Sequence, residues 1–407
     1  TIVMSKNPYV RKTYLSEIGN LIGKDLVKAI IGMRRTGKST IMDQIISVLV
    51  AEGIPESDIL KYDMESRRTP RFRDGDELYD DVASWASGKG HTYIFLDEIQ
   101  NLSGWQTCIR ALLTDLDADI FITGSSSKML SGELATHLAG RYVEITVRPF
   151  AFSEVADHYA TAGDDIRAED LFGLYIRHGG MPLIVADRYD PLTVDSVLRA
   201  MYDSVVINDI AGRRGIRNTT ALNEVMMYAM SETGHTVNSS NIRNYLGFQG
   251  KKASADSVLE YLDAAEDAMF VSKVLRRDVR GRGVLKIDHK YYLTDHGMRE
   301  SCGFSNTASI DQILENIVYN ELRYRGFDVT VGKSGGNEID FVASDGTRLE
   351  YYQVSYLLAS DATVEREFRS LMSVGDNYPK YVLSMDTVDM SRDGVIHRNI
   401  VDWLLGR

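Results

Sequence analysis

The chain of 407 residues contains few cysteines and no long apolar run. Its two cysteines, Cys108 and Cys302, lie far apart and lack the close spacing of metal ligands, which fits a reducing cytoplasm. No stretch of 18 apolar residues is present, so we expect no membrane span. The first residues, Thr1–Met4, lack a charged segment followed by an apolar one, so we expect no secretory signal.

Positive charge is also scarce, because 46 Lys and Arg face 58 Asp and Glu and give a formal net charge of −12. This balance argues against a protein that coats nucleic acid with its whole surface, although it leaves room for a local basic face. The apolar fraction of 44% and the charged fraction of 26% are ordinary for a globular protein. The length predicts about three domains.

The most specific motif is segment 32–39, Gly-Met-Arg-Arg-Thr-Gly-Lys-Ser, which matches the phosphate-binding loop pattern at every fixed position. The apolar run Leu26–Ile31 before it predicts a buried strand. Residues Thr40–Leu49 after it carry Ile and Leu at helical spacing. Since such a loop requires a strand before it and a helix after it, the context favours a nucleotide site over a chance match.

The loop residues have distinct expected roles. Lys38 would reach the β- and γ-phosphates of a bound triphosphate, and the Ser39 hydroxyl would bind Mg²⁺. Arg34 and Arg35 would help to attract phosphate. The residues expected to bind the nucleotide are Gly32, Arg34, Arg35, Thr36, Gly37, Lys38, Ser39 and Thr40.

Alternating strands and helices over the first 150 residues predict an α/β fold with a parallel sheet. In such sheets, ligands bind at the carboxyl ends of the strands. The predicted strand Tyr93–Glu98 ends in two acids, and the predicted strand Asp119–Thr123 leads into Gly124 and Ser125. We therefore expect these polar endings at the same edge of the sheet as the loop.

We expect the two acids to have different roles. Asp97 would hold Mg²⁺, directly or through water, and Glu98 would orient and polarise the attacking water. Adjacent acids favour hydrolysis, because a water nucleophile needs a carboxylate nearby; the alternative is a pair of solvated acids. Thr123 and Ser125 would contact the γ-phosphate or the water, unless they form an ordinary turn. Arg141 is a candidate arginine finger, or else a surface arginine in a salt bridge.

Beyond residue 150 the pattern changes twice. Residues 150–230 are predicted to be mainly helical, and later two helices followed by a strand hairpin have the order of a winged helix. The end of the chain predicts a small α/β unit. The expected segments are a P-loop core (1–155), a helical lid or linker (156–230), a winged helix (231–304) and a restriction-endonuclease-like domain (305–407).

The predicted hairpin is basic. Between Lys273 and Lys290, seven Lys or Arg stand against two Asp, a net charge of +5. This concentration is typical of contact with the backbone of duplex DNA, and a protein contact with a solvated basic face is the alternative. The candidate DNA-contacting residues are Arg276, Arg277, Arg280, Arg282 and Lys286, and a recognition helix would include Asn238–Arg243, flanked by Lys251 and Lys252.

The last segment has the layout of a restriction-endonuclease core whose centre has degraded. Glu315 on a helix and Asp340 on a strand would be its acids. The next strand has Gln353, Val354 and Ser355 where such a nuclease needs an acid, a spacer and a lysine, and strand parity puts Glu350 on the other face. Since one metal ligand and the lysine are missing, we expect a fold retained for binding or packing.

The motifs above occur in order with Gly140-Arg141, with segment 148–154 (Arg-Pro-Phe-Ala-Phe-Ser-Glu) and with segment 179–182 (Gly-Gly-Met-Pro). In this combination the chain resembles prokaryotic AAA-type ATPases that carry a C-terminal domain of the DUF4143 kind. The resemblance covers essentially the whole chain. It implies an ATPase module fused to a winged helix and a restriction-endonuclease-like domain.

The leading hypothesis is an ATP hydrolase coupled to a DNA- or protein-binding module. ATP rather than GTP follows from the resemblance and from the absence of an Asn-Lys-x-Asp sequence. A slow nucleotide-gated switch is the alternative, and an ATP-regulated nuclease is a third hypothesis that Gln353 and Ser355 disfavour. The sequence leaves open whether the protein forms homo-oligomers.

Overall fold

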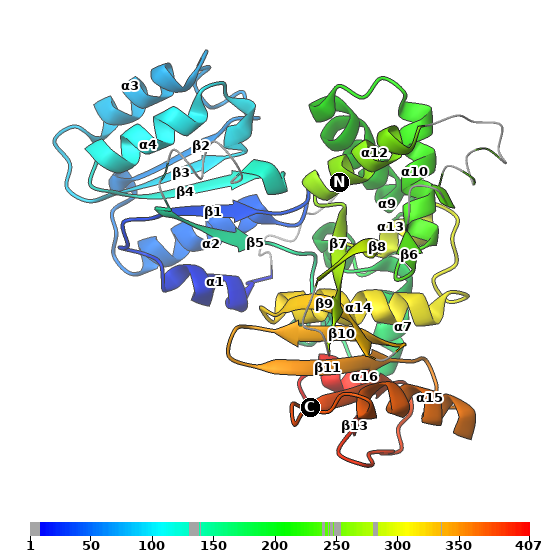
Figure 1. The fold of residues 1–407 in the computed structure, drawn as a ribbon. Helices are drawn as coiled ribbons and strands as arrows, with labels where there is room; N and C mark the ends of the chain where they lie inside the picture. Colours follow the sequence, from blue (N-terminus) through cyan, green and yellow to red (C-terminus); the bar gives the residue numbers. More distant parts are fainter. Residues whose placement is uncertain are drawn as a thin grey trace. The chain divides into compact units, whose positions relative to one another are not determined.

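The structure is a computed structural model that describes residues 9–129, 138, 140–237, 241, 242, 244, 247, 254–279, 284–334 and 336–407, without the side chains of residues 128 and 284–288. The chain divides into two compact units (Figure 1). Unit 1 comprises Thr1–Arg148 and Asp267–Met269, and unit 2 comprises Pro149–Glu266 and Phe270–Arg407.

Unit 1 is built on a five-stranded parallel sheet in the order β2-β3-β4-β1-β5. Figure 1 shows α3 and α4 on one face of the sheet and α1 and α2 on the other. The strands are β1 (Val27–Ile31), β2 (Ile59–Asp63), β3 (Thr92–Asp97), β4 (Ala118–Gly124) and β5 (Tyr142–Thr146). The helices are α1 (Lys12–Gly19), α2 (Lys38–Ala51), α3 (Gly75–Ala86) and α4 (Trp105–Asp115).

The core of unit 1 follows from strand alternation. Val27, Ala29 and Ile31 of β1 are fully buried against the apolar faces of α3 and α4, together with alternate residues of β3 and β4. The parallel α/β fold expected from the sequence is confirmed, with predicted strands within two residues of the observed ones. The sequence analysis did not identify β5, which pairs with β1 on its outer side.

Unit 2 begins with the helices that the sequence predicted, interrupted by a π-helix. They are α6 (Phe152–Thr161), α7 (Ala168–His178), α8 (Pro182–Ala186), α9 (Val194–Ser204), the π-helix η4 (Val205–Gly212), α10 (Thr219–Ser231) and α12 (Ala255–Asp267). The later helices are α13 (Gly297–Ser301), α14 (Ile310–Tyr324), α15 (Asp361–Met372) and α16 (Ile400–Leu404). Most of the expected recognition helix, 238–246, lies outside the described residues.

An eight-stranded sheet in the order β13-β12-β11-β10-β9-β7-β8-β6 runs through unit 2 (Figure 1). The predicted hairpin, β7 with β8, belongs to this sheet because β7 pairs in parallel with β9. The sequence did not predict this continuity between hairpin and C-terminal strands. The strands are β6 (Thr236–Val237), β7 (Val271–Asp278), β8 (Val284–Leu293), β9 (Asp328–Ser334), β10 (Asn337–Ser344), β11 (Leu349–Val354), β12 (Lys380–Ser384) and β13 (Ile396–Asn399).

The Gly-Gly-Met-Pro segment surrounds a buried carboxylate in unit 2. The side chain of Asp295 accepts the backbone N–H of Gly180 at 2.8 Å and that of Gly297 at 2.9 Å. Burial raises the pKa of Asp295 to about 6, against the opposing effect of these backbone donors. A Cβ atom on Gly179 would lie 2.3 Å from the Asp295 carboxylate, and one on Gly180 would lie 2.2 Å from the Phe150 carbonyl oxygen. The two glycines are therefore required by packing.

We predict opposite effects on stability for two alanine substitutions in unit 2. Gly180→Ala should destabilise the protein by about 3 kcal/mol, because the new methyl group overlaps backbone that cannot move freely. Gly173→Ala, in the interior of α7 where a Cβ meets no atom within 4 Å, should stabilise it by about 0.5–1 kcal/mol. Urea unfolding followed by circular dichroism measures both, and equal shifts would refute the packing argument.

Candidate nucleotide-binding site

The phosphate-binding loop depends on two glycines. Gly37 precedes α2 in the left-handed region with a φ of 97°, where a side chain would be strained. A Cβ atom on Gly32 would lie 2.3 Å from the carbonyl oxygen of Val147 and 2.9 Å from Oγ1 of Thr36. The Thr36 hydroxyl donates to the Met33 carbonyl at 2.9 Å and closes the loop from inside. The loop therefore has the tight backbone that a phosphate cradle needs.

The strand endings meet at one edge of the sheet, as the sequence predicted, since β3, β4 and β1 are neighbours. Thr123, at the end of β4, connects the two acids of β3. Its hydroxyl donates to the carboxylate of Asp97 and accepts the backbone N–H of Glu98 at 2.8 Å. Asp97 and Thr123 are both buried, so this link fixes the direction in which the acids point.

Lys38 lies inside the loop and contacts Glu98. Its Nζ atom is 3.3 Å from Oε1 of Glu98, and it donates to the carbonyl oxygens of Gly32 at 3.1 Å and Met33 at 3.3 Å. The side chain is almost fully buried. Burial lowers the pKa of Lys38, whereas the carboxylates of Glu98 and Asp97 oppose this shift. The ammonium thus lies where a phosphate can replace a carboxylate as its partner.

Glu98 is held by donors on both carboxylate oxygens. Oε2 accepts the Ser125 hydroxyl at 3.0 Å and the side-chain amide of Gln100, while Oε1 faces Lys38. Burial alone would raise the pKa of Glu98, but Lys38 and these donors outweigh it and keep the pKa below its usual value. Its backbone adopts a φ of 51°, which is uncommon for a residue other than glycine. The carboxylate is therefore ionised and fixed beside the loop.

The other loop residues are more exposed. Arg34 forms an ion pair with Glu65 at 3.2 Å, and Arg35 is exposed with a φ of 70°. Ser39 is exposed and Thr40 half-buried in the first turn of α2. A serine hydroxyl and the Asp97 carboxylate are hard oxygen ligands of the kind that Mg²⁺ takes, so the residues present fit a bound magnesium–nucleotide.

Arg141 lies at the amino ends of the strands of the sheet, whereas the loop lies at their carboxyl ends. Its carbonyl accepts the N–H of Val27 at 3.0 Å, at the amino end of β1, and its guanidinium pairs with Asp25. The five residues of β1 span about 16 Å. Arg141 therefore lies about one strand length from the loop of its own chain, and its role as an arginine finger stays a prediction.

Arg11 is a residue near the loop that the sequence analysis missed. It is buried, and its Nη1 atom donates to the carbonyl of Thr36 at 3.3 Å and to that of Arg148 at 2.7 Å. Its guanidinium carbon lies 4.5 Å from the centre of the Tyr14 ring, and its backbone N–H donates to the side chain of Gln44 at 3.3 Å. No motif marks a lone arginine before a short helix, so the sequence held no signal for it.

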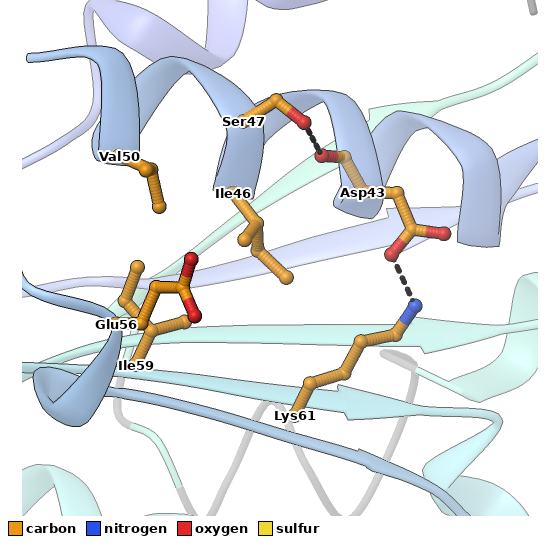
Figure 2. Close-up of a pocket in the computed structure, with 7 residues that line it drawn as sticks. All are labelled: Asp43, Ile46, Ser47, Val50, Glu56, Ile59 and Lys61. Atoms are coloured by element: carbon orange, nitrogen blue, oxygen red, sulfur yellow. Dashed lines mark hydrogen bonds and ion pairs between the residues drawn. The ribbon is translucent and has the colours of Figure 1, made fainter. Parts of the chain in front are cut away.

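A groove of about 550 Å³ lies between α2 and β2 (Figure 2). Figure 2 shows that Lys61 of β2 extends across the groove to Asp43 of α2. The apolar part of the groove is formed by Ile46, Val50 and Ile59. The lining residues include none of the expected nucleotide-binding residues. The groove is therefore separate from the phosphate-binding loop.

The basic hairpin is partly neutralised by later strands. Arg276 donates to Glu338 of β10 at 2.7 Å, and Lys290 is buried between Glu315 and Glu338. Arg277 is half-buried. Of the other candidate DNA-contacting residues, Arg280 and Arg282 lie outside the described residues, as does the side chain of Lys286.

Two family models match the chain. Residues 24–156 match that of an AAA domain, which confirms the AAA part of the resemblance. Residues 169–308 match a domain of unknown function, DUF8612, so the DUF4143 detail has no support. In the part of the chain that the structure describes, no helix has the length and apolar character needed to cross a membrane.

Relatives are similar over most of the chain. An uncharacterized protein of Haemophilus influenzae is 35% identical over 405 residues, which are 99% of this chain and 100% of that protein. An uncharacterized protein of Methanocaldococcus jannaschii is 29% identical over 84% of this chain and 77% of its own. The solved structure of a Walker-type ATPase of Pyrococcus abyssi covers 74% of this chain and 99% of that one, with a TM-score of 0.51 and 14% identity, a likeness of fold. The chain belongs to one family with the Haemophilus influenzae protein, and its residues 24–156 are an AAA domain with the P-loop ATPase fold.

Proposed function

We propose that the protein is a Mg²⁺-dependent ATP hydrolase whose reaction takes place at the phosphate-binding loop. The observation that carries this proposal is the contact between Lys38 and Glu98 at 3.3 Å. It brings a phosphate-binding ammonium from the start of α2 and a carboxylate from just after the end of β3 to one point. A site for binding alone would need the ammonium but not the carboxylate.

The proposed reaction begins with an exchange of partners at Lys38. The phosphates of ATP would replace Glu98 and the loop carbonyls as acceptors for the ammonium. Ser39 and Asp97 would hold Mg²⁺, which would supply positive charge to the phosphates. Glu98, kept in place by Ser125 and Gln100, then accepts a hydrogen bond from the attacking water and polarises it. Thr123 hydrogen-bonds to Asp97 and Glu98 and so fixes their positions relative to each other.

The first test is the substitution Glu98→Gln. It keeps the shape of the side chain but removes the carboxylate that activates water, so the rate of phosphate release should fall at least about 100-fold. ATP affinity should stay the same or increase, because Lys38 loses a competing partner. Phosphate release and equilibrium binding of ATP measure the two quantities.

Glu65→Gln is the matched control, because Glu65 is an acid near the loop whose carboxylate pairs with the outer residue Arg34. Its rate should stay close to that of the unmodified protein. If Glu98→Gln hydrolyses ATP at the unmodified rate, Glu98 is not the catalytic carboxylate. A very slow rate in the unmodified protein, with tight binding, would favour the alternative of a nucleotide-gated switch.

A second test concerns Arg11, which we propose to be a positioning residue for the loop. Arg11→Lys keeps the charge but removes the planar Nη1 group whose N–H bonds point at both carbonyls, so the KM for ATP should rise about 10-fold with a smaller change in kcat. Lys12→Met, on the exposed neighbour, should change neither constant. A loss of thermal stability with an unchanged KM would assign Arg11 a merely structural role.

A third test concerns Arg141, which we propose to act as a finger on the nucleotide of a neighbouring subunit. Phosphate release per subunit should then rise with protein concentration, and Arg141→Ala should reduce the plateau about 1,000-fold. Asp25→Asn releases the arginine from its ion pair and should retain activity. Activity independent of concentration, together with an unaffected Arg141→Ala variant, would exclude the finger.

We also propose that unit 2 carries the partner-binding part of the protein, with duplex DNA as the favoured partner and a protein as the alternative. Lys273 and Arg277 are the described hairpin residues that support it. The phosphate-release assay repeated with duplex DNA, over a range of salt concentrations, separates the two partners, because binding to the DNA backbone weakens as salt rises. An ATP-regulated nuclease is disfavoured by Gln353 and Ser355.

A further inference from the structure

Lys290 is a buried ammonium at the centre of unit 2. It lies near the end of β8, and its side chain is only 6% exposed. Its Nζ atom is 2.9 Å from Oε1 of Glu315 on α14 and 2.7 Å from Oε1 of Glu338 on β10. One ammonium therefore bridges two carboxylates that come from different elements.

A third carboxylate, that of Asp340, belongs to the same charge cluster. Asp340 is buried, its Oδ2 atom accepts the backbone N–H of Val354 at 2.8 Å, and its own N–H donates to Gln353 at 3.4 Å. Burial and the charge of Glu315 raise the pKa of Asp340, whereas Lys290 lowers it. The charges of Glu315 and Lys290 thus both act on the buried Asp340.

Two further donors reach the acids of the cluster. The Tyr292 hydroxyl donates to Glu315, and Arg276 donates to Oε2 of Glu338 at 2.7 Å. Burial alone would lower the pKa of Lys290, but Glu315, Asp340 and Glu338 outweigh it and raise the pKa. The lysine therefore stays charged at neutral pH and balances its acids.

We propose that the ammonium of Lys290 holds Glu315 and Glu338 together, with Asp340 in the same charge cluster, so that this cluster is a permanent ion-pair joint instead of a metal site. Glu315 and Asp340 are the acids that a nuclease of this layout would use to hold its metal. Here Glu315 pairs with a cation supplied by the hairpin strand β8. Among the described residues, no group of three or more His, Cys, Asp or Glu is placed to hold a metal.

The joint gives the cluster a structural task. Lys290 comes from β8 and Arg276 from β7, whereas the three acids come from α14 and β10. The ion pairs therefore connect the hairpin to the C-terminal strands across the central part of the eight-stranded sheet. A buried charge cluster of this kind stays favourable only while every charge has its partner, so loss of one member should weaken the whole junction.

The test measures stability and cation binding on the full chain, with Mn²⁺ alone as the probe. Lys290→Met removes the charge but keeps most of the side-chain volume, and it should lower the melting temperature by about 10 °C. Lys333→Met, on an exposed lysine of the neighbouring strand β9, is the control and should change it little. Added Mn²⁺ should leave the melting temperatures of Lys290→Met and of the unmodified protein unchanged, because the acids are not placed to hold a metal.

The double variant Lys290→Met with Glu315→Gln keeps the proposal testable even if the single variant barely folds. It removes one charge of each sign, so it should regain part of the lost stability. A double variant that is no more stable than Lys290→Met would refute charge balance. Binding of Mn²⁺ by the unmodified protein that Asp340→Asn abolishes, or Mn²⁺-dependent nicking of plasmid DNA with the same sensitivity, would show that the cluster is a metal centre.

Discussion

The site of unit 1 depends on how tightly the carboxyl end of β1 is held between its neighbours. The N–H of Gly32 donates to the carbonyl of Gly124 on one side, and the carbonyl of Ile31 accepts the N–H of Val147 on the other. A Cβ on Gly32 would collide with Val147, so the chain can turn into the loop at this point only with glycine. Because β4 and β3 belong to the same sheet as β1, these hydrogen bonds also fix the position of the loop relative to Glu98. Arg11 adds a second constraint, since it joins the loop carbonyl of Thr36 to the carbonyl of Arg148.

Three buried lysines show how surroundings decide what an ammonium can do. Lys28 of β1 pairs with Asp119 of β4 and donates to the carbonyl of Lys24 at 2.8 Å, so it joins strands at the edge away from the loop. Lys290 has two carboxylates within 2.9 Å, and a ligand would have to displace both. Lys38 has one carboxylate and two neutral carbonyls, which a triphosphate with several negative charges can outcompete. Of the three, only Lys38 combines weak partners with a position beside a phosphate-binding turn.

The sequence predicted the features that are local along the chain. The loop glycines, the strand that ends in Asp97 and Glu98, and the helices of residues 150–230 each follow from spacing within a short window, and the structure contains them. It could not predict the role of Arg11, because that side chain donates to a backbone carbonyl 25 residues away. Every residue has such a carbonyl, so the residue types along the sequence do not indicate this contact. The sequence also could not predict the position of Arg141 in the sheet. A Gly-Arg pair does not indicate whether the arginine will lie at the amino end or the carboxyl end of a parallel strand. The division into four segments stays a prediction, while the sheet of unit 2 runs across the boundary proposed at residue 304.

Charge counting along the chain overestimates a nucleic-acid surface when the sheet brings acids from later strands. The hairpin has a net charge of +5 as a sequence, yet Arg276 and Lys290 each contact Glu338, a residue of β10 that no window around the hairpin contains. A guanidinium that already has a carboxylate partner gains little by turning to a phosphate, because it would first lose that partner and leave the acid unpaired. Any DNA contact of this region must therefore depend on Lys273, Arg277 and the basic residues of the turn. Glu315 and Glu338, which hold Lys290 in place, also reduce the positive charge that the hairpin presents to a DNA backbone.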